Sequence, residues 1–191
     1  MKHATFDPLI EELKPSALVR RFASQIVCAS SGKPILDIAC GAGRNAFVFS
    51  SLGCSVICVD KDLGGLGAQQ LRLSRTSLSD ASVRLSPYQL DLFKDPWPFG
   101  ASQAGGIVNV HFLLPALFPF FESSIAPGGY LLVETVPGCG GNYLQLPKAG
   151  ELRFAFERSF DLEFYKERKV GPLSFDAVTV QLLGRRKECS R

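Results

Sequence analysis

Apolar residues between positions 15 and 28 recur at the three- and four-residue spacing of a helix, with polar or basic residues between them. The stripe consists of Leu18, Val19, Phe22, Ile26 and Val27. This pattern predicts an amphipathic helix that ends near Gly32, before the first strand. We therefore expect residues 1–33 to form a helical arm that covers the site, and residues 34–191 to form a single domain.

Short apolar runs without alternation follow this helix, as is typical of parallel strands buried on both faces. The predicted strands span residues 34–39, 54–59, 83–90, 106–110 and 130–136. The helices expected between them span residues 45–52, the region around 69–73, and residues 111–126. Pro127-Gly128-Gly129 is interpreted as the turn into the fifth strand. Alternating strands and helices predict a parallel sheet.

The alternation of strands and helices ends near the C-terminus, where a short helix predicted over 151–156 precedes two successive strands, predicted over 161–168 and 175–183. Val170-Gly171-Pro172 supplies the turn between these strands. The sequence thus predicts an α/β fold, a Rossmann-like three-layer sandwich. Its mostly parallel, seven-stranded sheet should end in an antiparallel hairpin.

A glycine-containing loop, from Asp37 to Gly43, comes where the first strand should meet the next helix. Open α/β sheets bind ligands at this carboxyl edge, and glycine lets the backbone approach a ligand closely. Asp60 ends the second strand, where a carboxylate can accept hydrogen bonds from both ribose hydroxyls of an adenosine. Asp91 follows the third strand, where it or the adjacent backbone can contact the adenine amino group.

The spacing Gly41-x-Gly43-x-x-Ala46 also fits the dinucleotide fingerprint of dehydrogenases. The acidic Asp37 before the first glycine and the C-terminal hairpin, in place of a second nucleotide-binding half, argue against that alternative. We therefore favour S-adenosylmethionine as the cofactor and S-adenosylhomocysteine as its product.

Two segments resemble the opening of class I S-adenosylmethionine-dependent methyltransferases: Asp37-Ile-Ala-Cys-Gly-Ala-Gly-Arg-Asn-Ala46 and Gly53-Cys-Ser-Val-Ile-Cys-Val-Asp60. Gly43-Arg44-Asn45 resembles the tellurite-resistance branch, whereas Ala39 stands where the family more often has glycine. The resemblance implies that the chain is a methyltransferase with a cofactor site at the ends of the first four strands. The implied cofactor residues are Asp37, Ala39, Gly41, Gly43, Arg44, Asn45, Asp60, Lys61, Asp91, Leu92 and Asn109.

Methyl transfer from a sulfonium is an in-line displacement, so it depends mainly on alignment in a site that excludes water. A base is needed only for an acceptor that arrives protonated. His111 follows the fourth strand and is the candidate base, although it could instead cap the next helix. Asn109-Val-His-Phe112 echoes the Asn-Pro-Pro-aromatic motif of amine methyltransferases, but both prolines are missing.

The acceptor is expected to contact residues at and after the end of the fifth strand. The candidates are Glu134, Thr135 and Tyr143. Tyr143 belongs to a glycine-rich segment, residues 137–148, which we interpret as a loop that closes over the acceptor.

Composition narrows the remaining choices. The six cysteines and two histidines lack zinc-ligand spacing, so we expect no metal. The net charge of +3 is small, which favours a small-molecule acceptor over a nucleic acid. Neither a secretory signal nor a membrane span is apparent, which favours a cytoplasmic protein. Two alternatives stay open: a nucleic-acid methyltransferase, suggested by Arg20-Arg21, Arg72, Arg75 and 185–187, and a non-catalytic adenosylmethionine-binding module.

Overall fold

The computed structural model describes residues 6–74, 84–136, 146–171 and 176–188. Within these residues, the strands form one seven-stranded sheet in the order β3-β2-β1-β4-β5-β7-β6. The strands are β1 (Ile35–Ile38), β2 (Val56–Asp60), β3 (Leu85–Gln89), β4 (Ala104–Val110), β5 (Ile125–Glu134), β6 (Phe160–Lys169) and β7 (Val178–Arg186). The first five are parallel, and β7 runs antiparallel to β5 and β6. The predicted fold is confirmed.

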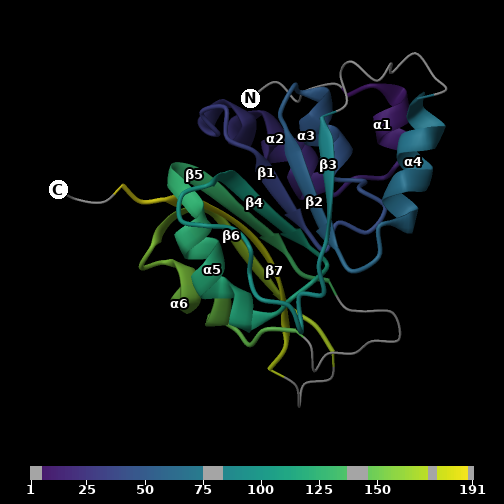
Figure 1. Ribbon diagram of the computed structural model, residues 1–191. Helices are drawn as coiled ribbons and strands as arrows, with labels where there is room; N and C mark the ends of the chain where they lie inside the picture. The colour runs from purple at the N-terminus through teal and green to yellow at the C-terminus, as the bar shows by residue number, and fades with distance from the viewer. Residues whose placement is uncertain (1–5, 75–83, 137–145, 172–175, 189–191) are drawn as a thin grey trace.

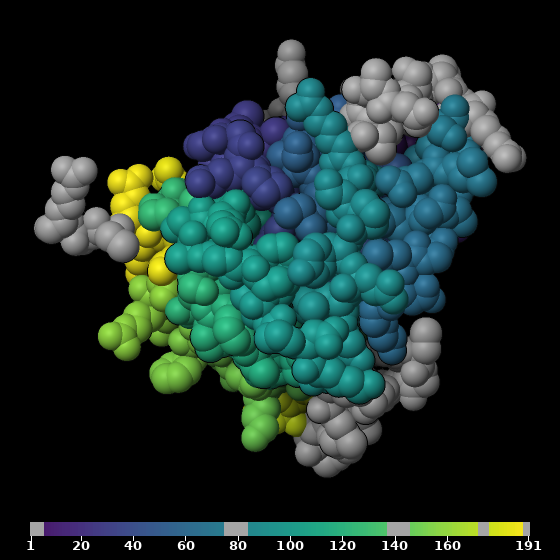
Figure 2. Space-filling view, in the orientation of Figure 1, coloured from purple at the N-terminus to yellow at the C-terminus, as the bar shows by residue number. Residues whose placement is uncertain are grey.

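Helices cover both faces of the sheet, giving three layers (Figure 1). One face carries α1 (Pro8–Glu12), α2 (Ala17–Ala29), α3 (Ala46–Ser51) and α4 (Gly64–Ser74). The other carries the 3-10 turn η1 (Pro115–Leu117), α5 (Phe118–Ser124) and α6 (Glu151–Phe156). Figure 2 shows the second face, where the stretch from β3 into α5, in teal, forms a continuous surface.

The N-terminal helix α2 is part of the main core. Phe22 and Ile26 are buried, and they belong to the same hydrophobic cluster as Val108 of β4 and Leu132 of β5. The stripe predicted from the sequence is thus the face of α2 that packs on the sheet. Whether residues 1–33 act as an arm over the site stays a prediction.

The fifth strand begins earlier than the sequence suggested, because Pro127-Gly128-Gly129 lies inside β5 instead of before it. The register with β4 shifts between Ala104, which pairs with Ile125, and Gly106, which pairs with Tyr130. The extra residues form an irregularity in the ladder. A Cβ on Gly129 would lie 2.6 Å from the Gly105 carbonyl oxygen, so glycine is required at this close approach.

One further predicted helix is too long, and one short helix was not predicted. The helix expected over 111–126 is reduced to η1 and α5, because prolines at 115 and 119 restrict where a helix can begin. Helix α1 was missed, although its signals are present: Asp7 accepts a hydrogen bond from the Leu9 N–H, and Pro8 occupies the first turn.

The strand order places β1 beside β4 in the middle of the sheet, with β2 on one side of the pair and β5 on the other. The connection after β1 therefore runs toward β2, and the connection after β4 runs the opposite way, toward β5. The carboxyl ends of β1 and β4 flank this switch point, which is where open α/β sheets bind ligands.

Candidate functional site

The loop after β1 is held by Asp60, the last residue of β2. The Gly41 N–H donates to Asp60 Oδ2 at 2.8 Å, and the Asp62 N–H donates to Oδ1 at 3.1 Å. Gly41 has φ of 54° and open space where a Cβ would be. This backbone is therefore exposed at the carboxyl edge, and it is fixed by the carboxylate predicted to bind the ribose.

The second glycine of the loop has a packing role. Gly43 is buried with φ of 77°, and a Cβ there would lie 2.5 Å from Cδ1 of Leu66 on α4. A side chain there would force Leu66 to move and would also be strained by the left-handed backbone. Gly43 thus has a structural reason to be glycine that does not involve a ligand.

Ala39 has a backbone conformation that favours glycine. Its φ is 54°, in the left-handed region, which costs a residue with a Cβ roughly 1–2 kcal/mol. The family's commoner glycine would avoid this strain. The sequence by itself showed no sign of this strain.

Asp37 is buried beneath the loop, with 1% of its surface exposed. Burial raises its pKa to about 7, despite a hydrogen bond from the Ala46 N–H and the nearby Arg44 charge, which both act in the opposite direction. Its Oδ2 atom has no hydrogen-bond partner among the described residues. An orphaned carboxylate oxygen at this edge suits a ligand that brings a donor or a positive charge.

Asn109, near the end of β4, also has an orphaned polar atom. It is 2% exposed, and its Nδ2 has no partner among the described residues. Asp37 and Asn109 come from neighbouring strands, with Asn109 opposite Ile38 in the register. The structure thus brings two predicted cofactor residues to the switch point with unused hydrogen-bonding capacity.

At the predicted adenine end, Asp91 shapes its own turn. The Phe93 N–H donates to Asp91 Oδ1 at 3.0 Å, and this bond, with Lys94 and Lys61 nearby, holds the pKa of Asp91 below its usual value. Leu92 is partly buried against the core beneath α5. Lys61 is exposed, and its carbonyl accepts a bond from Gln89.

Sequence reasoning missed an aromatic pair beside this turn. Phe93 is 69% exposed, and its ring meets that of Phe112 edge to face at 5.7 Å. The two residues follow β3 and β4, so the topology brings them together. The available signal was an aromatic residue two positions after Asp91.

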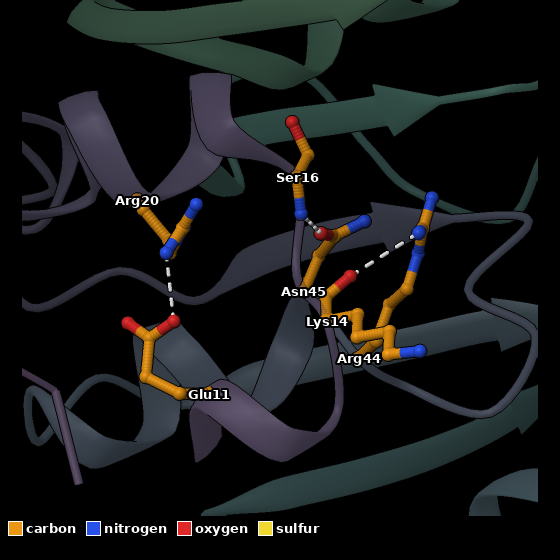
Figure 3. Close-up of polar contacts among 6 residues, drawn as sticks. All are labelled: Glu11, Lys14, Ser16, Arg20, Arg44 and Asn45. Carbon is orange, nitrogen blue, oxygen red and sulfur yellow. Dashed lines mark hydrogen bonds and ion pairs between the residues drawn. The ribbon is translucent and has the colours of Figure 1, made fainter. Parts of the chain in front are cut away.

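Arg44 and Asn45 contact the N-terminal segment, as Figure 3 shows. The Ser16 N–H donates to Asn45 Oδ1 at 3.0 Å, and an Arg44 nitrogen donates to the Lys14 carbonyl at 3.3 Å. Lys14 has φ of 53°, so the chain bends sharply here. Both side chains thus fasten the segment before α2 to the loop after β1; a direct role with a cofactor stays a prediction.

Ser16 also joins this segment to the end of β5. Its hydroxyl donates to Glu134 Oε2 at 2.5 Å and accepts from the N–H groups of Leu18 and Val19, which caps α2. Gln181 of β7 donates to the other carboxylate oxygen of Glu134 at 2.7 Å. Glu134 is 8% exposed, so both of its oxygens are paired inside the protein.

His111 follows β4 in a left-handed conformation, with φ of 65°, and its N–H donates to the Glu134 carbonyl at 2.8 Å. A second Arg44 nitrogen lies 3.0 Å from His111 Nδ1. Because a guanidinium can only donate, Nδ1 must accept, and the ring proton of the neutral imidazole is on Nε2. Partial desolvation of the ring and the Arg44 charge lower the pKa of His111, while Glu134 raises it.

A polar cavity of about 200 Å³ opens where β5, β7 and β6 adjoin. It is lined by Glu134, Thr135, Val136, Lys166, Arg168, Thr179 and Gln181. Thr135 is 3% exposed, and its hydroxyl accepts from the Val180 N–H at 2.8 Å. Glu134 and Thr135, predicted as acceptor contacts, therefore line the same cavity.

The remaining features singled out in the sequence are either outside the described residues or not part of the site. Tyr143, the glycine-rich start of its loop, Cys139 and Cys189 fall outside the described residues. Within the described residues, no group of histidine, cysteine, aspartate or glutamate is arranged to hold a metal, and no helix has the length and apolarity to span a membrane. Cys40, Cys54 and Cys58 are buried, and Cys28 is exposed.

No known family model matches the chain. A curated relative, ribosomal RNA small subunit methyltransferase J from Laribacter hongkongensis, is 33% identical over 92 residues, which are 48% of this chain and 32% of the relative. The match thus spans about a third of that protein.

Solved structures with the same fold are more distant in sequence. TehB from Haemophilus influenzae has a TM-score of 0.61 at 18% identity, covering 86% of this chain and 62% of TehB. A geranyl diphosphate methyltransferase in complex with SAM has a TM-score of 0.63 at 14% identity, and the match covers 93% of this chain and 88% of that enzyme. The [4+2]-cyclase SpnF has a TM-score of 0.61 at 15% identity, and the match covers 87% of this chain and 78% of SpnF. The chain therefore has the fold of S-adenosylmethionine-dependent methyltransferases.

Proposed function

We propose that this protein is an S-adenosylmethionine-dependent methyltransferase that acts on a small-molecule acceptor. The observation that carries this proposal is the loop after β1. Asp60 fixes its backbone, and Asp37 beneath it has an orphaned buried oxygen. The fold and the partial match to a ribosomal RNA methyltransferase support the assignment. The Gly43-Arg44-Asn45 triplet favours the tellurite-resistance branch.

The residues present fit the cofactor by their chemistry. Asp37 and the open backbone at Gly41 suit the charged methionine portion, and Asp60 suits the ribose hydroxyls. Asp91 and the Phe93 ring suit the adenine, which stacks on aromatic rings. The bound cofactor supplies an electrophilic methyl group on sulfur. The protein aligns the acceptor with it and excludes water.

The curated relative keeps a nucleic-acid acceptor as the second candidate. The basic residues of this chain that suggested a nucleic acid, except Arg75, which falls outside the described residues, make contacts within the protein. Arg20 and Arg72 form ion pairs with Glu11 and Glu12, at 2.7 and 2.8 Å, and Arg21 stacks on two phenylalanine rings. Arg185, Arg186 and Lys187 donate to backbone carbonyls. This arrangement favours the small-molecule acceptor.

Binding of S-adenosylhomocysteine tests the proposal directly. We expect isothermal titration calorimetry to show saturable binding of S-adenosylhomocysteine and none of NAD, because Asp60 provides one acidic ribose anchor and the described sheet ends in the antiparallel β5-β7-β6 arrangement. Affinity for NAD alone would refute the assignment. Turnover of a labelled methyl group with thiols, hydroxyls, amines and chalcogen oxyanions then separates an enzyme from a non-catalytic binding module.

We propose further that His111 acts as a hydrogen-bond donor through Nε2 and not as the general base predicted from the sequence. Nitrogen-15 NMR should find Nδ1 unprotonated and Nε2 protonated at neutral pH. Arg44→Gln should raise the pKa of His111, because the Arg44 charge lowers it. The signal is assigned by its loss in His111→Gln.

Turnover provides the second readout for His111. Loss of a general base costs about 10²–10⁴-fold in rate. We expect His111→Gln, which keeps a side-chain N–H donor, to retain activity within about tenfold and His111→Ala to lose more. A drop in His111→Gln as large as that of a lost base, with a pH profile that loses its limb near neutrality, would restore the base assignment.

A further inference from the structure

The cavity between β5, β7 and β6 contains two cations whose placement follows from strand register. Lys166 lies opposite Gln181, which also lies opposite Glu134, and Arg168 lies opposite Thr179. Residues directly opposite each other in an antiparallel pair share a face of the sheet. Lys166 and Arg168 are therefore on the face that carries Glu134, and both line the cavity.

Neither cation is neutralised within the described part of the chain. No carboxylate there lies within salt-bridge distance of Lys166 or Arg168. The Glu134 carboxylate also lines the cavity, but its oxygens accept hydrogen bonds from Ser16 and Gln181, and the two cations outnumber it. Glu167, between the two cations on β6, contacts the Tyr165 hydroxyl and the Gly150 N–H instead.

The cavity adjoins the exit of β4. The His111 N–H binds the carbonyl of Glu134, whose side chain lines the cavity. The Arg44 contact leaves the imidazole with a proton on Nε2, so this end of the sheet supplies donors and positive charge. An acceptor that arrives as an anion suits these groups and needs no base.

We propose that this cavity binds an anionic methyl acceptor, with Lys166 and Arg168 as the groups that neutralise its charge; this rests on the methyltransferase function proposed above. The acceptor is a small molecule bearing a thiolate, carboxylate or oxyanion. A volume of about 200 Å³ holds such a group, whereas Arg20, Arg72 and the basic residues at 185–187 make their contacts outside the cavity.

Inorganic phosphate is the probe, titrated into the full chain saturated with S-adenosylhomocysteine and followed by amide NMR. Saturable shifts are expected at residues 134–136, 166–168 and 179–181. The double variant Lys166→Gln, Arg168→Gln should weaken phosphate binding about tenfold or more, as expected for lost charge-assisted hydrogen bonds. The control Lys33→Gln, Lys169→Gln removes the same charge at positions that are exposed, as Lys166 and Arg168 are, but lie outside the cavity, so it should change phosphate affinity less than about twofold.

Equal losses in the two double variants, or shifts that do not saturate, would overturn the proposal, since phosphate would then respond to net charge alone. A short single-stranded RNA is the second probe. Tighter binding of RNA than of phosphate, dependent on Lys166 and Arg168 and falling steeply with salt, would assign the cavity to a nucleic acid instead. Failure of S-adenosylhomocysteine to bind would contradict the proposed function, whereas its normal binding to both double variants isolates the test of the cavity.

Discussion

The stability of the ligand-free protein is expected to fall between about pH 4 and about pH 7, and Asp37→Asn should remove most of that fall. Asp37 has a pKa near 3.9 in an unfolded chain and of about 7 in the folded protein. Between these two pKa values the folded state holds a proton on Asp37 that the unfolded state has released. The free energy of unfolding is therefore highest below the unfolded pKa, and it falls until the pH exceeds the folded pKa. The difference corresponds to a cost on the order of 4 kcal/mol above pH 7.

Thermal melts across this pH range measure the effect. For a chain of this size, the cost corresponds to a drop of roughly 10 °C in the wild type. Asp37→Asn cannot ionise, so its melting temperature at pH 8 should exceed that of the wild type. Asp62→Asn is the matched control, because Asp62 is exposed and two residues beyond Asp60. Parallel pH profiles for Asp37→Asn and the wild type would show that Asp37 titrates normally.

Ligand binding gives an independent measure of the same group. If S-adenosylhomocysteine brings its ammonium to the orphaned Asp37 oxygen, binding near pH 7 should release a proton. Calorimetric heats would then differ between buffers of different ionisation enthalpy. Asp37→Asn should abolish that difference.

Asp60→Ala should weaken S-adenosylhomocysteine binding by about 1.5–3 kcal/mol, the usual contribution of hydrogen bonds to a charged group. Two effects combine here. The ribose loses its proposed acceptor, and the Gly41 N–H loses the carboxylate that fixes the loop. Asp60→Asn keeps an oxygen for one of these bonds and should fall between the wild type and Asp60→Ala.

Calorimetric titrations of the three proteins, with Asp62→Ala as the control, test this expectation. Asp62 accepts from the Gly64 N–H and does not contact the loop after β1 in the described structure. Its loss should change affinity by less than about 0.5 kcal/mol, as for most exposed substitutions. Equal affinities for Asp60→Ala and the wild type would remove Asp60 as the ribose anchor.

The sequence by itself determined the fold class and predicted the edge of the sheet at which the candidate site lies. Apolar runs such as Val56–Val59 are strands because both faces of the sheet are covered. Asp60 ends such a run, so the sequence alone places its carboxylate at the carboxyl edge of the sheet. Local signals also fixed α6 at residues 151–156. These features depend on periodicity and on residues near in sequence, which is why they were predictable.

Tertiary structure alone decided which groups meet. Ser16, Asn45 and Glu134 are far apart in the chain, and their hydrogen bonds join α2 to the sheet's carboxyl edge. The proton position on His111 depends on Arg44, a residue from another strand's loop. The register of β6 with β7 brings Lys166 and Arg168 to the cavity. Such contacts follow from packing between distant segments, for which local patterns along the chain carry no signal.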